Sequence, residues 1–281
     1  MQEGRFSRTA HGVAARRAAH QLFDQPRVLH DPLALPIIGP EAAAKLRSSP
    51  RAQSVAARAF RAFMAVRSRY AEDQLATAVK QGVRQYVVLG AGLDTFAYRN
   101  PYPGLRVFEV DRPATQDWKR GRLQSAGIAV PQSVAYVPVD FERQQLAVEL
   151  ERGGLDLKLP AFFCWLGVTP YLTRESCMAT LSIIGKMTVG SGVAFDFAVD
   201  PKLLGVRERV ALYVLSRRVA AAGEPFQLFF RPAELVDELK KLGFTRTEML
   251  GAQEINIRYF SNRSDGLCIR GDVGRLMGAW V

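Results

Sequence analysis

The sequence predicts a doubly wound α/β fold with a mostly parallel, seven-stranded sheet, preceded by a helical cap. Three observations support this. Short, continuous apolar runs recur along the chain, as expected for strands that are buried on both faces. Helix-like segments alternate with the first five of these runs, which is typical of right-handed crossovers between parallel strands. The first run also ends in a glycine-rich turn, Gly90-Ala91-Gly92, and a helix is expected directly after this turn. The 281 residues are 48% hydrophobic, enough for a packed interior.

The first 80 residues are predicted to be helical. A first helix is expected at Ala10–Phe23, followed by a segment that four prolines interrupt. A long helix is expected over Arg51–Lys80, where apolar side chains recur at helical spacing. We therefore expect residues 1–80 to form the helical cap.

From residue 81 onward the pattern changes to that of the sheet. The predicted strands are Tyr86–Leu89, Leu105–Val110, Val134–Val139, Ala161–Leu166, Val193–Val199, Phe244–Leu250 and Gly266–Ile269. The predicted helices are Pro113–Ser125, Arg143–Arg152, Arg174–Lys186, Leu203–Ala222 and Pro232–Leu242. The alternation pauses after Pro201, so we expect 81–281 to form the core, with 201–230 as a helical insertion.

The charge and the cysteines exclude several classes of protein. The formal net charge is +11, and residues 1–80 hold 13 Lys and Arg against 6 Asp and Glu. A basic face can bind nucleic acid or a membrane surface, but no basic run is interleaved with aromatic residues, so a solvated, arginine-rich surface is favoured. No signal peptide is expected, because residues 1–20 contain arginines but no apolar stretch, and no apolar run is long enough to cross a bilayer. Three cysteines without metal-ligand spacing indicate reduced thiols, no metal and a cytoplasmic location.

The most informative stretch is the glycine turn after the first predicted strand. Glycines at Gly90 and Gly92 allow a sharp turn and let a ligand approach the backbone around Ala91. Asp111 ends the next apolar run, nineteen residues beyond Gly92. An acid at this spacing can accept hydrogen bonds from both hydroxyls of a ribose, which favours a nucleoside site over a carboxylate that merely caps a turn.

Three further residues fit such a ligand. Asp140 and Phe141 follow the third predicted strand, where a carboxylate can bind an adenine amino group and a ring can pack on the base; helix capping is the alternative role for Asp140. Arg67 lies on the apolar face of the long helix and requires an anionic partner. That partner is either a ligand carboxylate or an internal acid such as Asp94 or Glu109. Arg69 is predicted to point elsewhere, toward the surface.

These residues together resemble the leucine carboxyl methyltransferase family, especially its bacterial branch of S-adenosylmethionine-dependent methyltransferases and polyketide O-methyltransferases. The resemblance covers nearly the whole chain and rests on ordered motifs. They are Arg67-Ser68-Arg69-Tyr70, Leu89-Gly90-Ala91-Gly92-Leu93-Asp94-Thr95, Phe108-Glu109-Val110-Asp111, Val139-Asp140-Phe141 and Trp165-Leu166-Gly167-Val168-Thr169-Pro170-Tyr171-Leu172-Thr173, with shorter matches near both ends.

The resemblance implies a class I methyltransferase, Rossmann-like fold and the cofactor S-adenosyl-L-methionine. It assigns Arg67 or Arg69 to the cofactor carboxylate and Gly90, Ala91 and Gly92 to the methionine portion. It places Asp111 at the ribose and Asp140 with Phe141 at the adenine. Leu166 stands where the family often has a Glu, which removes an acid near the methionyl amino group.

The expected function is O-methylation of a carboxyl or hydroxyl group on a small molecule. No catalytic base is predicted; Tyr171 and Asp200 follow strands where an acceptor would lie, and Phe226, Phe229 and Phe230 form either a lid or part of the core. Three alternatives remain open: a cofactor-binding protein without catalysis, a basic nucleic-acid-binding module and a nicotinamide-dependent reductase. A dinucleotide site would require a third glycine that is absent here.

Overall fold

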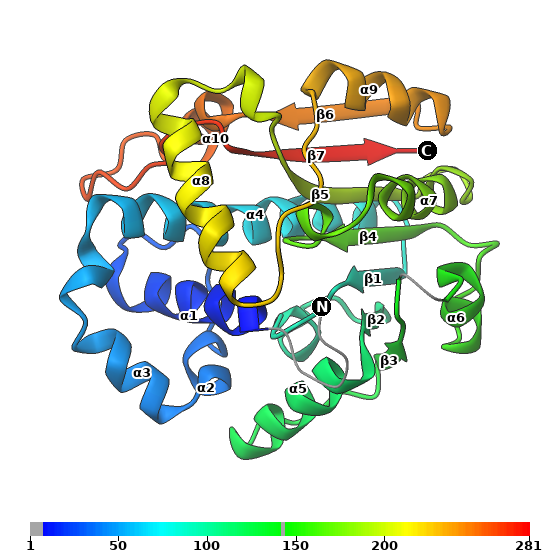
Figure 1. The fold of residues 1–281 in the computed structure, drawn as a ribbon. Helices are drawn as coiled ribbons and strands as arrows, with labels where there is room; N and C mark the ends of the chain where they lie inside the picture. Colours follow the sequence, from blue (N-terminus) through cyan, green and yellow to red (C-terminus); the bar gives the residue numbers. More distant parts are fainter. Residues whose placement is uncertain (1–7, 142–143) are drawn as a thin grey trace.

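The fold is built on a seven-stranded sheet with the order β3-β2-β1-β4-β5-β7-β6 (Figure 1). The computed structural model describes residues 8–141 and 144–281. The strands are β1 (Gln85–Leu89), β2 (Arg106–Asp111), β3 (Val134–Pro138), β4 (Ala161–Trp165), β5 (Gly192–Ala198), β6 (Arg246–Leu250) and β7 (Gly274–Trp280). The first five strands are parallel, whereas β7 runs antiparallel to both β5 and β6. The predicted seven-stranded, mostly parallel sheet is confirmed.

Helices cover both faces of the sheet. The helices are α1 (Arg8–Phe23), α2 (Ala34–Ile38), α3 (Pro40–Arg47), α4 (Val55–Lys80), α5 (Pro113–Ser125), α6 (Leu146–Arg152), α7 (Arg174–Gly185), α8 (Val206–Ala221), α9 (Pro232–Lys241) and α10 (Ala252–Tyr259). The side chains of β1 alternate between two apolar clusters. Val87 and Leu89 pack in the cluster that includes α6, α7 and α9, whereas Tyr86 and Val88 pack in the cluster that includes α4 and α10. This alternation follows from the two-residue period of a strand.

The strand order reverses beside β1, and this reversal locates the site. From β1 the chain continues outward to β2 and β3, and then returns to place β4 on the other side of β1. Ligands of open α/β sheets bind at the carboxyl ends of the strands at such a switch point. In Figure 1 the arrowheads of β1 and β4 point toward the side of the molecule where α1, α2, α3 and α8 lie.

Three sequence-based expectations about elements were wrong. The predicted strand Gly266–Ile269 has no strand structure, and the last strand is β7, at Gly274–Trp280. The helix expected directly after Gly92 is only a 3-10 turn at Phe96–Tyr98, because the chain instead enters a network of ion pairs that is described below. The long helix begins at Val55 rather than Arg51, and the Ser54 hydroxyl caps it by accepting from the Ala57 N–H at 3.3 Å.

The remaining boundaries differ by a few residues. The predicted start of one helix at Arg143 lies outside the described residues, and α6 begins at Leu146. Helices α2, α3 and α10 were not predicted. The division into a cap at 1–80, a core at 81–281 and an insertion at 201–230 stays a prediction.

Candidate functional site

The glycine turn is fixed against the end of β2. The N–H groups of Gly90 and Ala91 donate to the Val110 carbonyl at 2.8 and 3.0 Å. The next N–H, from Gly92, donates at 2.7 Å to Oδ2 of Asp111. The structure therefore brings together the predicted turn and the predicted acid through a direct hydrogen bond.

Gly90 is required by a close approach from the loop after β4. Its φ is +67°, and a Cβ at this position would lie 2.3 Å from Cγ2 of Val168. Ala10, near the start of α1, approaches the other glycine, since a Cβ on Gly92 would lie 3.1 Å from its methyl group. The turn is therefore covered from two sides. Packing and a positive φ both require glycine at Gly90, whereas at Gly92 the contact is only tight and the positive φ of +44° is the main reason for glycine.

Asp111 and Asp140 lie at the tips of the neighbouring strands β2 and β3. The Val139 N–H donates to the Asp111 carbonyl at 2.9 Å, which holds the two strand ends together. Arg112 lies between the acids: its N–H donates to Oδ1 of Asp111 at 2.7 Å, and its Nη2 lies 3.4 Å from Oδ1 of Asp140. Burial raises the pKa of Asp111, although hydrogen bonds from the backbone oppose the shift. Phe141 is half-buried and packs against the cluster that includes α6 and α7.

Arg67 is buried on α4, as predicted, but its acidic partner is Asp196 on β5. Nη1 of Arg67 lies 2.8 Å from Oδ2 of Asp196, whose Oδ1 accepts the Gly167 N–H at 2.5 Å. The guanidinium lies against Gly167, where a Cβ would come within 2.8 Å of Nη2. The two internal partners that the sequence suggested are engaged elsewhere: Asp94 pairs with Arg17, and Glu109 pairs with Lys119.

Asp196 was not predicted from the sequence, although a signal was present. It is the one charged residue in the apolar run Val193–Val199. A carboxylate in such a strand is costly to bury unless a cation neutralises it. The cation that neutralises it is Arg67, the arginine on the apolar face of the long helix.

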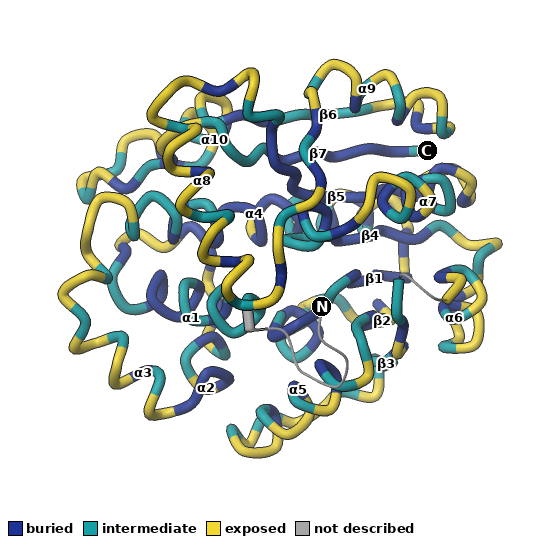
Figure 2. The backbone as a smooth tube through the Cα atoms, viewed as in Figure 1, coloured by how far each residue is buried: buried dark blue, intermediate teal, exposed yellow. Residues whose placement is uncertain are grey.

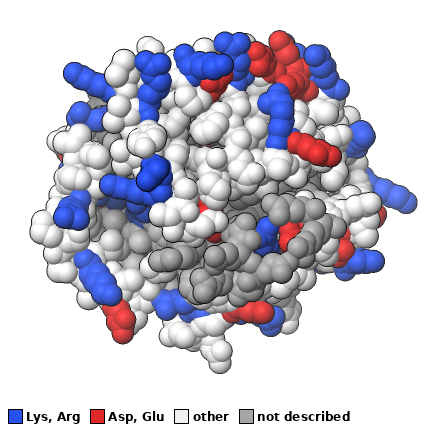
Figure 3. Space-filling view, in the orientation of Figure 1, with Lys and Arg blue, Asp and Glu red and all other residues white. Residues whose placement is uncertain are grey.

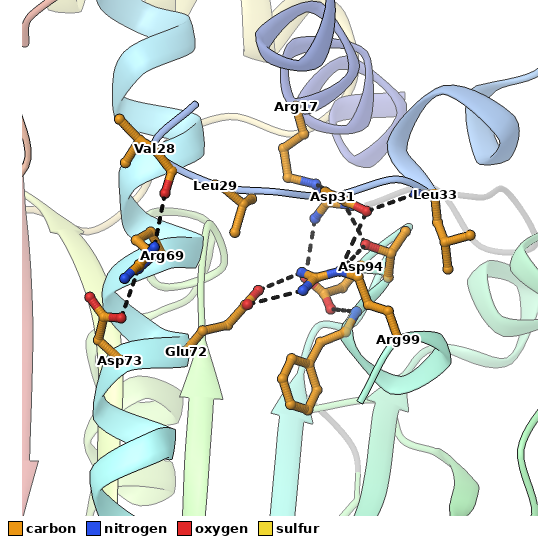
Figure 4. Close-up of polar contacts among 12 residues, drawn as sticks. Arg17, Val28, Leu29, Asp31, Leu33, Arg69, Glu72, Asp73, Asp94 and Arg99 are labelled. Carbon is orange, nitrogen blue, oxygen red and sulfur yellow. Dashed lines mark hydrogen bonds and ion pairs between the residues drawn. The ribbon is translucent and has the colours of Figure 1, made fainter. Parts of the chain in front are cut away.

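Arg69 lies away from this cluster. Its side chain is 48% exposed, and its Nε donates to Oδ1 of Asp73 at 2.7 Å, one turn along α4 (Figure 4). Nη1 of Arg69 lies 3.4 Å from the Val28 carbonyl. Its position agrees with the expectation from helical spacing that Arg69 points toward the surface.

A network of ion pairs connects α1 and α4 to the residues that follow the glycine turn (Figure 4). Arg17 on α1 donates to the Leu93 carbonyl at 2.6 Å and to Oδ2 of Asp94 at 3.1 Å. Arg99 binds Glu72 on α4 with both terminal nitrogens, at 2.5 and 3.0 Å. Burial alone would raise the pKa of Asp94, but the charges of Arg17, Lys119 and Arg99 lower it.

Asp31 lies at the centre of this network. Its side chain is fully buried. Oδ2 of Asp31 lies 3.6 Å from Nε of Arg17, and Oδ1 lies 3.4 Å from Nε of Arg99. Its Oδ2 also accepts the Thr95 hydroxyl at 2.7 Å. The network therefore holds the exit from the glycine turn against the N-terminal helices, a role that the sequence analysis did not assign to these residues.

A second group of side chains lies after β4. The segment that follows α8 is bound to the loop 168–172 through the Gln227 N–H, which donates to the Pro170 carbonyl at 2.7 Å. The rings of Tyr171 and Phe226 lie 5.1 Å apart between centroids. Glu224 is only 5% exposed, and its Oε2 accepts the Thr9 N–H at 3.2 Å. Burial raises the pKa of Tyr171 to about 12.

The other residues that the sequence singled out pack against the core or cap a turn. Leu166 is half-buried and packs with the cluster that includes α4. Phe230 is buried in the core, and Phe226 and Phe229 pack at its edge. Asp200 caps the short turn that follows β5, since its Oδ1 accepts the Lys202 N–H at 2.9 Å.

Within 8–141 and 144–281, no group of three or more His, Cys, Asp or Glu side chains could hold a metal ion. Among the same residues, no helix combines the length and apolar character needed to cross a membrane.

The sequence is similar to a family model and to bacterial proteins. Residues 10–185 match the model of a family described as leucine carboxyl methyltransferase. A Bacillus subtilis protein named "Putative S-adenosyl-L-methionine-dependent methyltransferase YktD" is 37% identical over 207 residues, which is 72% of this chain and 67% of that protein. A protein of the same descriptive name from Saccharopolyspora erythraea is 34% identical over 191 residues, 67% of this chain and 66% of that protein. The match therefore spans about two thirds of each relative's length.

A solved structure supports the fold itself. A protein from Thermobifida fusca, described as a "putative methyltransferase", has a TM-score of 0.58 at 16% identity, covering 99% of this chain and 96% of that one. At this identity the likeness concerns the architecture of the sheet and helices.

Proposed function

The chain belongs to the leucine carboxyl methyltransferase family, and on that premise we propose that it transfers a methyl group from S-adenosyl-L-methionine to an oxygen atom of a small molecule. The observation that carries the proposal is the hydrogen bond from the Gly92 N–H to Asp111 at the tips of β1 and β2. It places a glycine turn and a carboxylate together at the switch point of the sheet, where a nucleoside is bound in this class of fold.

The residues at the tips of β1, β2 and β3 fit this cofactor. Each oxygen of Asp111 accepts one backbone N–H, and a carboxylate oxygen has capacity for a further hydrogen bond. Both oxygens are therefore able to accept from the two hydroxyls of a ribose. Asp140 and Phe141, at the tip of the next strand, are assigned to the adenine. The turn from Gly90 through Ala91 to Gly92 is assigned to the methionine portion.

We assign the cofactor carboxylate to Arg67 rather than to Arg69. Arg67 is buried behind Gly167 at the carboxyl end of β4, whereas Arg69 is half-exposed and paired with Asp73. Asp196 holds Nη1 and fixes the plane of the guanidinium. The remaining donors of the fork then suit a carboxylate, which Arg binds with two parallel hydrogen bonds.

The protein contributes mainly by positioning. S-adenosylmethionine supplies a methyl group on a positively charged sulfur. The chain has to hold the acceptor oxygen in line with that methyl group and exclude water. Correct positioning of two reactants accounts for about 7–11 kcal/mol of a barrier. The network of Arg17, Asp31 and Arg99 serves this purpose by fixing the exit from the glycine turn.

We place the acceptor beside Tyr171, Phe226 and Glu224. Tyr171 lies in the loop after β4 whose Val168 packs against Gly90, and the segment that carries Glu224 and Phe226 is bound to this loop. Glu224 is a buried carboxylate, which would repel an acceptor carboxylate and would accept the proton of an acceptor hydroxyl. We therefore favour a hydroxyl group, on a partly aromatic or apolar molecule, over a carboxyl group.

The experiment has two stages. Isothermal calorimetry with S-adenosylhomocysteine should show binding at one site, whereas titration with NADH should show none; the opposite result would overturn the proposal. A panel of hydroxyl- and carboxyl-bearing molecules is then incubated with donor carrying a tritiated methyl group. Label in a methyl ether, which is stable to alkali, supports a hydroxyl acceptor, whereas label that alkali releases as methanol indicates a carboxyl acceptor.

Leu166 favours one alternative, a protein that binds the cofactor without catalysing transfer. Its apolar side chain packs into the α4 cluster and supplies no acid for the methionyl amino group. Binding of S-adenosylhomocysteine without label transfer to any acceptor would support this alternative. A Leu166→Glu variant with increased affinity would show that the missing acid limits cofactor binding.

A further inference from the structure

One face of α8 carries exposed apolar side chains. Val206, Val210, Tyr213 and Val214 follow helical spacing and share one side of the helix. Their exposed fractions are 69%, 58%, 63% and 43%, and Leu203, just before the helix, is 50% exposed. We call these five residues the α8 apolar face. Figure 2 shows that α8 is exposed along most of its length.

The opposite side of α8 is anchored to the protein. Leu212 and Val219 are buried, two helical turns apart. Glu208 points inward, since it accepts the N–H of Gly205 at 2.8 Å and that of Asp272 at 2.6 Å. Because these contacts fix the rotation of the helix, the apolar face cannot turn toward the core. An apolar stripe that the fold holds at its surface indicates an interaction site.

Four arginines accompany this face. Arg207, Arg209, Arg217 and Arg218 are all exposed, and within the described part of the chain none of them forms an ion pair. At 3.6 residues per turn, Arg207 and Arg218 border one side of the stripe, Arg209 borders the other, and Arg217 lies in line with it. Figure 3 shows Lys and Arg side chains with uncharged surface between them on the upper left of the molecule, where Figure 1 places α8.

We propose that the α8 apolar face binds the surface of a membrane that contains anionic lipids. A helix with an apolar stripe bordered by cations lies in the interface plane, with the apolar side chains among the lipid tails and the cations at the phosphates. Tyr213 suits this position, because its ring is apolar and its hydroxyl is polar. The assignment departs from the sequence-based expectation that no membrane takes part.

The charges argue against a second copy of the chain as the occupant. Two α8 helices packed face to face would bring eight arginines together, four from each copy, without an exposed acid on either helix to neutralise them. Like charges at an interface oppose association. An anionic lipid surface is complementary to the same four side chains.

The position of α8 suggests a use for this contact, which rests on the proposed function. The segment after α8 leads directly to Glu224 and Phe226, beside Tyr171. A face held on the bilayer would therefore bring the acceptor side of the site close to apolar molecules dissolved in the membrane.

The test is co-sedimentation of the full chain with vesicles, measured without cofactor so that the result is independent of the proposed function. Vesicles of equal parts phosphatidylcholine and phosphatidylglycerol should bind the protein, and added salt should weaken the binding. Vesicles of phosphatidylcholine alone should bind the protein at least about tenfold more weakly, because they carry no net negative charge to attract the four arginines.

Two variants and a control complete the design. Val210→Asp and the double variant Arg217→Glu, Arg218→Glu should each reduce binding to the mixed vesicles about tenfold or more. Val189→Asp is the matched control, because Val189 is 80% exposed but lies outside α8, before β5, and this change should leave binding unaltered. Thermal melts confirm that all variants are folded.

Three outcomes would overturn the proposal: no binding to anionic vesicles, equal binding by Val210→Asp and the wild type, or a loss with Val189→Asp as large as that with Val210→Asp. A dimer in analytical ultracentrifugation that Val210→Asp dissociates, with no vesicle binding, would instead assign the face to a second copy of the chain.

Discussion

Nη1 of Arg67 on α4 lies 2.8 Å from Oδ2 of Asp196 on β5, and both side chains are less than one-tenth exposed. This ion pair connects the long helix to the sheet at the place where the cofactor carboxylate is proposed to bind. Because the same guanidinium also lies against Gly167, the pair fixes the loop after β4 and the orientation of Arg67 together.

Removing Arg67 should therefore destabilise the fold, whereas removing Arg69 should not. Arg67→Ala leaves the Asp196 carboxylate buried without a cation, which costs about 3–5 kcal/mol. Arg69→Ala breaks a half-exposed pair with Asp73 and should change the free energy of unfolding by less than about 1 kcal/mol. Denaturation in urea measures the free energy of unfolding of both variants. Equal losses would show that the buried Arg67–Asp196 pair stabilises the fold no more than the half-exposed Arg69–Asp73 pair.

Arg67→Lys separates binding from stability. Lysine keeps a positive charge beside Asp196 but loses the planar fork that suits a carboxylate. We expect this variant to fold and to bind S-adenosylhomocysteine about tenfold or more weakly, while Arg69→Lys keeps the wild-type affinity. Calorimetry with the two variants side by side provides the comparison; the reverse order of affinities would assign the cofactor carboxylate to Arg69.

Asp111→Ala should weaken S-adenosylhomocysteine binding by about 1–3 kcal/mol, because the ribose hydroxyls lose their hydrogen-bond acceptor in a partly buried site. Asp117→Ala is the control, since Asp117 is an exposed acid on the neighbouring helix α5. Calorimetry checks both changes. An unchanged affinity in Asp111→Ala would rule out the ribose assignment.

The sheet was largely predictable, because its signal is local. Six of the seven predicted strands overlap β1 to β6, since a buried strand between helices is a short apolar run. The seventh was misplaced. β7 contains two glycines and Ala279, residue types that are depleted in strands. It is a strand because β5 and β6 pair with it on both sides.

The site was predictable in part for the same reason. The turn and Asp111 are given by a motif with fixed spacing, and the structure joins them. The partner of Arg67 was not predicted, because Asp196 is 129 residues away in the sequence and only the packing of α4 on β5 brings them together. The network around Asp31 was missed in the same way, since its members come from separate elements.

Gly90→Ala should disturb the turn far more than a glycine change elsewhere. Gly104 is the matched control: its φ is +77°, close to the +67° of Gly90, but an added Cβ there meets nothing within 4 Å. Both variants carry the strain of a positive φ, which costs about 1 kcal/mol. Only Gly90→Ala adds a clash with Val168, so it should lose more stability and also lose S-adenosylhomocysteine binding. Equal melting temperatures and affinities for the two variants would contradict the close approach.

The buried ion pair of Asp24 predicts how stability depends on pH. Nε and Nη2 of Arg61 each donate to Asp24 at 2.7 Å. Nδ1 of His20 lies 2.8 Å from the same carboxylate; it carries the ring proton, because Nε2 accepts the Val28 N–H at 3.0 Å. Burial alone would raise the pKa of Asp24, but these hydrogen bonds lower it from 3.8 to about 2.

An acid whose pKa is lower in the folded state stabilises the protein above its unfolded pKa, and this stabilisation is lost as the pH falls toward the folded value. The difference in unfolding free energy between wild type and Asp24→Asn should therefore be constant above about pH 5 and shrink by about 2 kcal/mol between pH 5 and pH 2. Urea denaturation across this range measures it. Asp117→Asn, at an exposed position, should change the free energy of unfolding by less than about 0.5 kcal/mol. A constant difference for Asp24→Asn down to pH 2 would mean that the carboxylate is not held ionised by Arg61 and His20.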